Sequence, residues 1–176
     1  MNKLLKTVLS SSTILAVFCC SGQVLAQSQC NQAVESVKQD LSRRGYFSPA
    51  NAFGRLRNPE VRVNNRFIVE SFHNYPSART TTVEFVLTDT NRNSISNLYN
   101  FPQLMTTLAS QIINSCDGVG LVYFCYFIEG GVPVGYFPNN TIRPFTIFDP
   151  STPDSRIRPH YNSRNKTYQW GYFYGL

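Results

Sequence analysis

The sequence has few of the residues, and none of the short motifs, that mark common metal and catalytic sites. Its two histidines, His73 and His160, lie 87 positions apart, and it has neither an HExxH nor a CxxC pattern. It also lacks a G-x-S-x-G serine turn, a GxGxxG nucleotide fingerprint and a phosphate-binding loop. We therefore expect no metal ion, no cofactor and no catalytic residue that a motif would identify.

Long regular patterns are missing as well. There is no low-complexity tract, no heptad array and no repeat at a solenoid period. The apolar run near the N-terminus is too short, and too broken by serine and glycine, to form a permanent transmembrane helix. With 42% hydrophobic and 14% aromatic residues, the 176-residue chain has a globular composition. These features predict a single globular domain after a short N-terminal segment.

That N-terminal segment, residues 1–26, is typical of an export signal. A cationic start is followed by apolar residues, and Val24-Leu25-Ala26 supplies the small or aliphatic positions that a signal peptidase reads. We expect cleavage after Ala26 and a periplasmic or extracellular domain over residues 27–176. The alternative is a lipoprotein with Cys20 lipidated, but Val17-Phe18-Cys19 is bulky where such a site needs small residues.

Export to an oxidising compartment predicts a disulfide. Cleavage would leave Cys30, Cys116 and Cys125. Cys30 begins one predicted helix and Cys116 ends another, both on the apolar stripe, so we expect these two to pair. Pairing of Cys116 with Cys125 is less favourable, because a strand leaving the helix carries its fifth residue about 16 Å away. Cys125 would then remain as the unpaired cysteine.

Two stretches have the period of amphipathic helices. The first covers residues 29–44, with Ser28 as N-cap and Gly45 as C-terminal stop. The second begins at Pro102, a favourable first position, and ends before Gly118. Their apolar stripes consist of Cys30, Ala33, Val34, Val37 and Leu41 in the first, and Leu104, Met105, Leu108, Ile112 and Cys116 in the second.

Two neighbouring segments, residues 67–73 and 80–88, alternate like half-buried strands and predict a hairpin. The register that gathers the apolar residues on one face pairs Phe67 with Leu87, Val69 with Phe85 and Ser71 with Val83. In the loop that precedes this predicted hairpin, we expect at most a short strand near Val61 and Val63.

Four further strands are expected. Residues 119–128 are nearly all apolar and predict a central strand covered on both faces. Others are expected at 132–137, 141–148 and 167–174, with Pro144 indicating an edge or a bulge. The fold class is therefore α+β: one domain with two amphipathic helices on one face of a mostly antiparallel sheet of about six strands.

The predicted hairpin suggests one catalytic arrangement. Its register places Glu70 opposite Glu84, with Cβ atoms about 5 Å apart, a spacing at which retaining glycosidases use two carboxylates. The alternatives are a register shifted by two residues, or Arg66 or Arg79 reaching between the two carboxylates. A glycan-acting hydrolase is thus one hypothesis for the function.

A nucleophilic thiol is a second catalytic arrangement. Cys125 with His73 or His160 would form a dyad if the imidazole lay within hydrogen-bond reach of the sulfur. The strand face that Cys125 shares with Leu121 and Tyr123 instead favours a buried, inert thiol.

Basic residues suggest an anionic partner. Without Lys3 and Lys6, the chain has 14 basic and 10 acidic residues, a net charge of +4, and 12 of the 14 are arginine. The planar guanidinium suits carboxylate, phosphate and sulfate groups. Eight of the 14 lie in two segments, at Arg55, Arg57, Arg62 and Arg66, and at Arg156, Arg158, Arg164 and Lys166. These would form an anion site if the two segments meet, and ordinary solvated loops if they do not; nucleic acid is not expected as a partner.

A row of aromatic residues follows the second basic segment. Tyr168, Trp170, Tyr172 and Tyr174 alternate along the last predicted strand. If exposed, the row would stack on sugar rings; if buried, which the need to cover the sheet favours, it would be a packing layer. The candidate binding residues are Arg156, Arg158, His160, Arg164 and Trp170.

The run from Ile112 to Phe124, with Cys116-Asp117 leading into a valine-rich strand, and the ending Tyr168-Gln169-Trp170-Gly171-Tyr172 resemble small exported cyanobacterial proteins of unassigned function. That group also has a second cysteine pair near the C-terminus, which this chain lacks between Ile147 and Leu176. The resemblance implies export and one compact domain, and supplies no catalytic residues.

Our leading hypothesis from the sequence is an exported, non-enzymatic domain that binds an anionic glycan or another envelope or extracellular component. The alternatives are the hydrolase using Glu70 and Glu84, and an interaction or inhibitor domain that binds a protein partner through a sheet edge.

Overall fold

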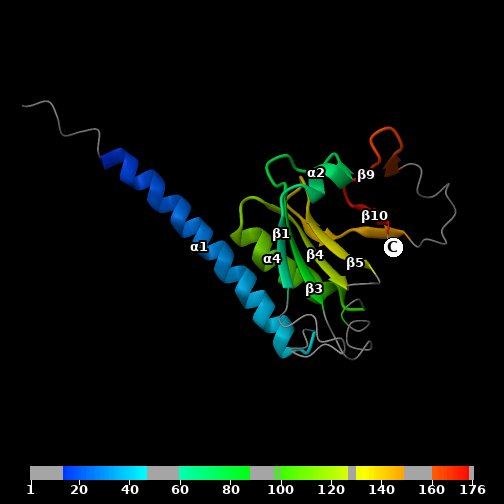
Figure 1. The fold of residues 1–176 in the computed structure, drawn as a ribbon, viewed down its shortest axis with the longest axis horizontal. Coiled ribbons are helices and arrows are strands. Elements are labelled where there is room, and N and C mark those ends of the chain that lie inside the picture. The colour runs from blue at the N-terminus through cyan, green and yellow to red at the C-terminus, as the bar shows by residue number, and fades with distance from the viewer. Residues whose placement is uncertain are drawn as a thin grey trace, which may run out of the picture.

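The chain combines helices with a mixed β-sheet, as the α+β prediction requires (Figure 1). A computed structural model describes residues 14–46, 60–87, 98, 100–126, 130–148 and 160–174. The helices are α1 (Ile14–Arg43), α2 (Phe67–Ser71) and α4 (Pro102–Ser115). The strands are β1 (Glu60–Asn64), β2 (Phe72–His73), β3 (Thr81–Leu87), β4 (Val119–Tyr126), β5 (Gly130–Tyr136), β6 (Ile142–Pro144), β7 (Thr146–Phe148), β8 (Tyr161–Asn162), β9 (Thr167–Gln169) and β10 (Tyr172–Tyr174).

The main sheet has five strands in the order β1-β3-β4-β5-β6. Strands β3 and β4 are parallel, and the other neighbours are antiparallel. A parallel pair needs a crossover connection, and α4 lies in the segment between β3 and β4. The predicted central strand is confirmed: β4 lies in the middle of the order, with Val122 buried on one face and Leu121 on the other.

The predicted hairpin of residues 67–73 and 80–88 is wrong. Residues 67–71 form α2, and β3 pairs with β1 instead. The side chain of Asn64 accepts hydrogen bonds from the backbone N–H groups of Arg66 (2.9 Å) and Phe67 (3.0 Å), which fixes the turn into α2. Ile68 is buried in α2, and Phe72 is buried at the start of β2. Ile68 and Phe72 are four positions apart, a spacing that fits both the period of a helix and the alternation of a strand. A segment of seven residues is therefore too short to distinguish the two.

One hydrophobic cluster joins α1 and α4 to β3, β4 and β5. It includes Leu41 from α1 and Ile112 from α4, both fully buried. Phe85 of β3 and Phe124 of β4 stack within it, with ring centroids 5.7 Å apart. The predicted apolar stripes of both helices therefore provide core residues.

A second cluster, which we call the aromatic cluster, consists of Ile68, Phe72, Leu121, Phe137, Phe145 and Trp170. The Trp170 ring meets Phe145 edge to face at 4.8 Å and Phe72 at 5.4 Å, and its Nε1 donates to the Tyr136 carbonyl at 3.0 Å. Because Leu121 points to the face of β4 opposite Val122, the aromatic cluster attaches α2, β2 and the C-terminal strands to the second face of the main sheet.

Those C-terminal strands form two small sheets, in place of the single strand predicted over 167–174. The order in one is β2-β9-β8, and β10 pairs with β7 in parallel in the other. The chain turns at Trp170 and Gly171, where Gly171 has a positive φ of 95°. Residues 141–148 are likewise divided into β6 and β7 at Phe145, and β6, which contains Pro144, is an edge strand as predicted.

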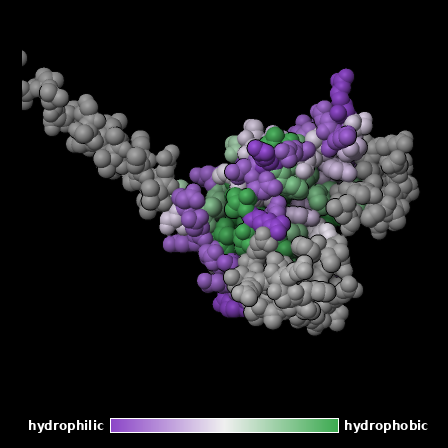
Figure 2. Space-filling view, viewed as in Figure 1, coloured by the Kyte–Doolittle hydropathy of each residue, from purple (hydrophilic) through white to green (hydrophobic). Residues whose placement is uncertain are grey.

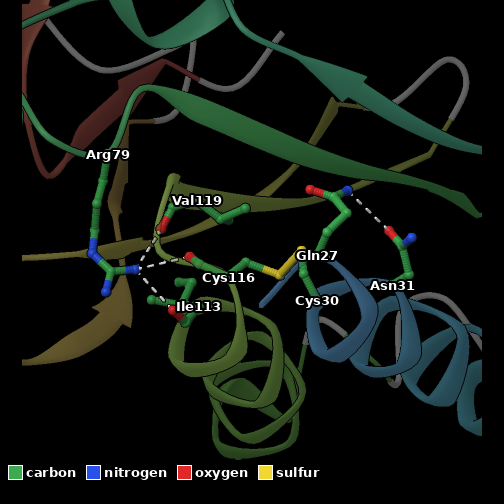
Figure 3. Close-up of a disulfide and its surroundings, with 7 residues drawn as sticks. All are labelled: Gln27, Cys30, Asn31, Arg79, Ile113, Cys116 and Val119. Carbon is green, nitrogen blue, oxygen red and sulfur yellow. Dashed lines mark hydrogen bonds between the residues drawn. A yellow bond between two sulfur atoms is a disulfide. The ribbon is translucent and has the colours of Figure 1, made fainter. Parts of the chain in front are cut away.

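The predicted disulfide is confirmed (Figure 3). Cys30 and Cys116 are bonded, with Cα atoms 4.8 Å apart, and Cys125 is not part of a disulfide. The bond links α1 to the residue that follows α4. Beside it, one nitrogen of Arg79 donates to the carbonyls of Ile113 (2.8 Å), Cys116 (3.2 Å) and Val119 (3.0 Å).

Helix α1 begins earlier than predicted, at Ile14, and its N-terminal part extends past α4 and the sheet (Figure 1). Residues 1–13 of the predicted export signal lie outside the described residues. Among the helices that the structure describes, none is both long and apolar enough to cross a membrane.

Candidate binding surface

The structure brings three of the predicted binding residues into one region, the β2-β9-β8 sheet and its surroundings. His160 precedes β8, Arg164 lies in the turn between β8 and β9, and Trp170 follows β9. Arg156 and Arg158 lie outside the described residues.

The turn between β8 and β9, residues 163–166, is exposed throughout. The side chain of Asn162 accepts hydrogen bonds from the backbone N–H groups of Arg164 (3.1 Å) and Asn165 (3.3 Å), and Lys166 has a left-handed φ of 53°. Figure 1 shows this turn projecting from the body, and the same projection is hydrophilic in Figure 2. The Asn162 side chain thus fixes a turn that presents Arg164 and Lys166 to solvent.

Both histidines hydrogen-bond to side chains of β9. His73 Nδ1 lies 3.1 Å from Thr167 Oγ1, and His160 Nδ1 lies 3.4 Å from Gln169 Oε1. Thr167 and Gln169 are two positions apart on one strand, so they share a face of the sheet. Sequence reasoning missed this convergence, because only the pairing of β2 with β9 brings His73 beside Gln169.

The imidazole of His160 belongs to a stack of three rings. It lies 3.6 Å from the Tyr172 ring, nearly parallel to it, and 5.8 Å from the Phe148 ring. All three side chains are half-buried. The stack holds the orientation of His160 while leaving part of its ring open to solvent.

The predicted aromatic row does not form one continuous platform on which sugar rings could stack. Because the chain turns after Gln169, Tyr168 and Tyr172 belong to different sheets. Trp170 is only 5% exposed, inside the aromatic cluster, so its indole has no open face for a sugar ring. Trp170 therefore packs within the fold, as the favoured alternative of a packing layer expects.

Charge is distributed unevenly along the chain. Among the described residues from Gly118 onward there is no aspartate or glutamate, whereas Arg143, Arg164 and Lys166 are all exposed. Arg143 also lies over the Phe137 ring, with its Cζ 4.0 Å from the ring centroid. Towards the C-terminal end of α1, by contrast, basic side chains pair with acids, in Lys38–Glu35, Arg43–Asp40 and Arg44–Asp40.

The two predicted basic segments approach each other at their described ends. Arg66 is exposed and directly precedes α2, whose residues contact β9, the strand that follows Lys166. Figure 1 shows α2 and the β8–β9 turn at the same end of the molecule. Arg55 and Arg57 lie outside the described residues. We use the term basic end for Arg66, His160, Arg164 and Lys166.

The glycosidase hypothesis loses its geometric basis. Glu84 lies opposite Arg62 on β1, while Glu70 is exposed on α2, so the predicted opposition of the two carboxylates is wrong. Arg79 does not reach between them but binds the carbonyls at the end of α4. The thiol of Cys125 donates to the Phe85 carbonyl at 3.6 Å. Within the described part of the chain, no group of three or more potential metal ligands comes together.

Comparison of the chain with protein-family models, with curated proteins and with solved structures finds no match.

Proposed function

We propose that this chain is a small exported domain that binds an anionic component of the cell envelope or the extracellular space through its basic end. The observation that carries the proposal is the exposed pair Arg164 and Lys166 on a fixed turn, in the C-terminal part of the chain, whose described residues from Gly118 onward include no acid. None of those C-terminal residues supplies a carboxylate that would neutralise this positive charge, so the charge is available to an external anion.

The chemistry of the basic end favours a carboxylate, phosphate or sulfate group. A guanidinium can donate two parallel hydrogen bonds to such a group, and a lysine ammonium adds a compact charge. The partly open His160 ring, stacked on Tyr172, supplies a further nitrogen and a flat surface nearby. A glycan that carries anionic groups on its sugar rings would use both the charges and the flat surface.

Two observations support export. The signal-like residues 1–26 precede the folded part, and the Cys30–Cys116 disulfide is of a kind that persists in oxidising compartments. Mass spectrometry of the protein recovered from outside the cytoplasm should find a chain that begins at Gln27. An uncleaved chain retained in the cytoplasm would contradict this part of the proposal.

The binding part is tested with immobilised anionic polysaccharide, peptidoglycan and phosphatidylglycerol vesicles at low and moderate salt. We expect saturable binding to one of these that weakens as salt rises, because exposed charges are screened. The double variant Arg164→Ala/Lys166→Ala should weaken it by about tenfold or more. Tenfold corresponds to about 1.4 kcal/mol, close to the lower end of what a single charge-assisted hydrogen bond contributes.

The matched control is Arg43→Ala/Arg44→Ala, which removes the same charge from exposed positions at the C-terminal end of α1. If both double variants weaken binding equally, the effect is one of net charge, and the basic end is not the site. Absence of binding to all three materials would overturn the proposal.

A further inference from the structure

Gln27, the residue that would follow the predicted signal cleavage, lies at an exposed position of α1. Helix α1 runs through Ala26 and Gln27 without a break, and both residues are exposed. Among the described residues of α1, those that pack in the hydrophobic core begin at Cys30. Cleavage after Ala26 would therefore leave these core contacts in place and make Gln27 the first residue of the helix.

The side-chain amide of Gln27 is accessible and weakly held. Its Nε2 donates to Oδ1 of Asn31 at 3.4 Å, and Figure 3 shows this contact beside the Cys30–Cys116 disulfide. The distance is longer than that of an ordinary N–H···O hydrogen bond, and Asn31 is exposed as well. Because water can replace such a contact, releasing the amide from Asn31 costs little free energy.

The backbone nitrogen of Gln27 would become a terminal amine after cleavage. The first N–H groups of a helix have no hydrogen-bond partner within the helix, so an amine at this position can turn toward its own side chain. An α-amino group is also less basic than the side chain of lysine, so a fraction of it is neutral and nucleophilic near neutral pH. Cleavage would thus place a nucleophile and an amide carbon in one residue, at the spacing of a five-membered ring.

A terminal ammonium would carry an unfavourable charge at this place. The N-terminal end of a helix has partial positive charge, so a cation there is destabilising. No acidic residue lies between Gln27 and Val34 to offset it. The disulfide bonds Cys30 to Cys116, which is 4% exposed, so the start of the helix stays attached to the domain. Removal of the charge would therefore stabilise the first turn, as N-terminal acetylation does.

We propose that Gln27 cyclises to pyroglutamate after cleavage, an inference that rests on the export part of the proposed function. The α-amino nitrogen attacks Cδ of the same residue, so that a bond between these two atoms forms and the bond between Cδ and Nε2 breaks. Nε2 leaves as ammonia and takes a proton from the amine, so neither an oxidant nor a co-reactant is needed. The product is an uncharged lactam, which offers no α-amine to an aminopeptidase.

Two acids could compete with ring closure by holding the amine as an ammonium. Glu35 and Asp117 line one groove together with Gln27. Glu35 already lies 3.3 Å from Lys38, and both acids are exposed, where ion pairs contribute little. Ring closure, by contrast, is a covalent step that releases ammonia. We therefore expect the lactam, and not an ion pair, at the start of the processed chain.

The test is mass spectrometry of the protein collected from outside the cytoplasm. Reductive dimethylation of the intact protein first blocks every free amine, so that no ring can close during digestion. The disulfide is then reduced, and trypsin, which cuts after arginine alone in dimethylated protein, yields residues 27–43 as the N-terminal peptide. In most of the protein, this peptide should have no dimethyl group at its N-terminus and should be lighter than the unmodified sequence by one ammonia molecule.

Variants separate ring closure at Gln27 from other causes. Gln27→Glu and Gln27→Ala keep the Val24-Leu25-Ala26 recognition sequence, and both should carry the dimethyl group. A carboxylate reacts poorly with an amine, and alanine has no side-chain carbonyl. Gln29→Ala, the matched control, removes an exposed glutamine of the same helix and should cyclise like the wild type. An aminopeptidase should shorten Gln27→Ala and leave the wild type at full length.

The outcomes distinguish this inference from the proposed export. A chain that begins at Gln27 and carries the dimethyl group there would overturn ring closure while leaving export intact. A chain that begins at another residue outside the cytoplasm would also overturn this inference alone, whereas an uncleaved chain in the cytoplasm would overturn both. Loss of ammonia from the same peptide of Gln27→Ala would contradict the assignment, because the ammonia would then come from another residue.

Discussion

At the scale of single residues, Arg79 holds separate elements together. Its guanidinium donates to three carbonyls around the end of α4 and lies 4.4 Å from the centroid of the Tyr136 ring. The last carbonyls of a helix lack partners within the helix and carry partial negative charge. An arginine therefore satisfies these acceptors and complements the helix dipole at the same time.

We predict that Arg79→Ala lowers the free energy of unfolding by about 2–4 kcal/mol, because buried carbonyls lose charged donors. Arg79→Lys should recover only part of the loss, since an ammonium lacks the planar fork of the guanidinium. Urea denaturation followed by circular dichroism measures both variants. Arg164→Ala, at an exposed position, serves as the control, and an equal loss in that variant would contradict the role of Arg79.

Tyr123 predicts a dependence of stability on alkaline pH. Burial, assisted by the nearby Cys125 and Glu84, raises the pKa of Tyr123 from 10.0 to about 12. Between these values the unfolded chain loses the phenol proton while the folded chain keeps it, so the stability that this group contributes is present below pH 10 and is lost as the pH rises toward 12.

The urea midpoint should therefore fall more steeply between pH 10 and pH 12 in the wild type than in Tyr123→Phe, which cannot ionise at this position. The difference between the two slopes isolates Tyr123 from the other tyrosines. Parallel slopes would contradict the raised pKa of Tyr123.

At the scale of elements, the sequence predicts long segments better than short ones. Helix α4 and the C-terminal part of α1 span several helical turns, so their apolar period is unambiguous, and the Cys30–Cys116 pair follows from it. The eight-residue β4 is equally clear from its continuous apolar run. Segments of two to five residues, such as α2, β2 and β9, are too short to show a complete hydrophobic period. In addition, β2 and β9 pair with each other although they lie far apart along the chain.

The turn that divides the last predicted strand depends on Gly171. Its φ is positive, and a Cβ atom there would lie 2.9 Å from Cε1 of Phe137. We predict that Gly171→Ala costs about 1–3 kcal/mol, from backbone strain and from displacement of a packed ring. Gly45 also has a positive φ, but no atom of the described residues lies within 4 Å of the place that a Cβ atom would take there.

Gly45→Ala therefore measures the backbone strain alone. Thermal unfolding of both variants should show a larger loss for Gly171→Ala than for Gly45→Ala. If the two losses are equal, Phe137 is not restricting position 171.

At the scale of the whole molecule, the disulfide joins the N-terminal helix to the rest of the fold across 86 positions of sequence. We predict that the double variant Cys30→Ser/Cys116→Ser lowers the free energy of unfolding, by at most about 4–5 kcal/mol on the chain-entropy estimate. Cys125→Ser, which removes the thiol that lies outside the disulfide, is the control, and a reductant should destabilise it as much as the wild type. A wild-type midpoint that does not change on reduction would contradict this role of the disulfide.

The sequence could indicate the proposed binding surface only in part. The basic residues near Arg164 are evident in the sequence, whereas their combination with His73 and His160 on one sheet depends on the β2–β9 pairing. Sites built from distant segments have no local signature in one sequence.

The most direct test of the central claim measures the affinity of the full chain for an immobilised anionic polysaccharide at several salt concentrations. Two double variants, one at the basic end and one at the C-terminal end of α1, are measured under the same conditions. The account predicts that affinity falls as salt rises, and that Arg164→Ala/Lys166→Ala weakens binding about tenfold while Arg43→Ala/Arg44→Ala changes it little. Unchanged binding by Arg164→Ala/Lys166→Ala would contradict the account.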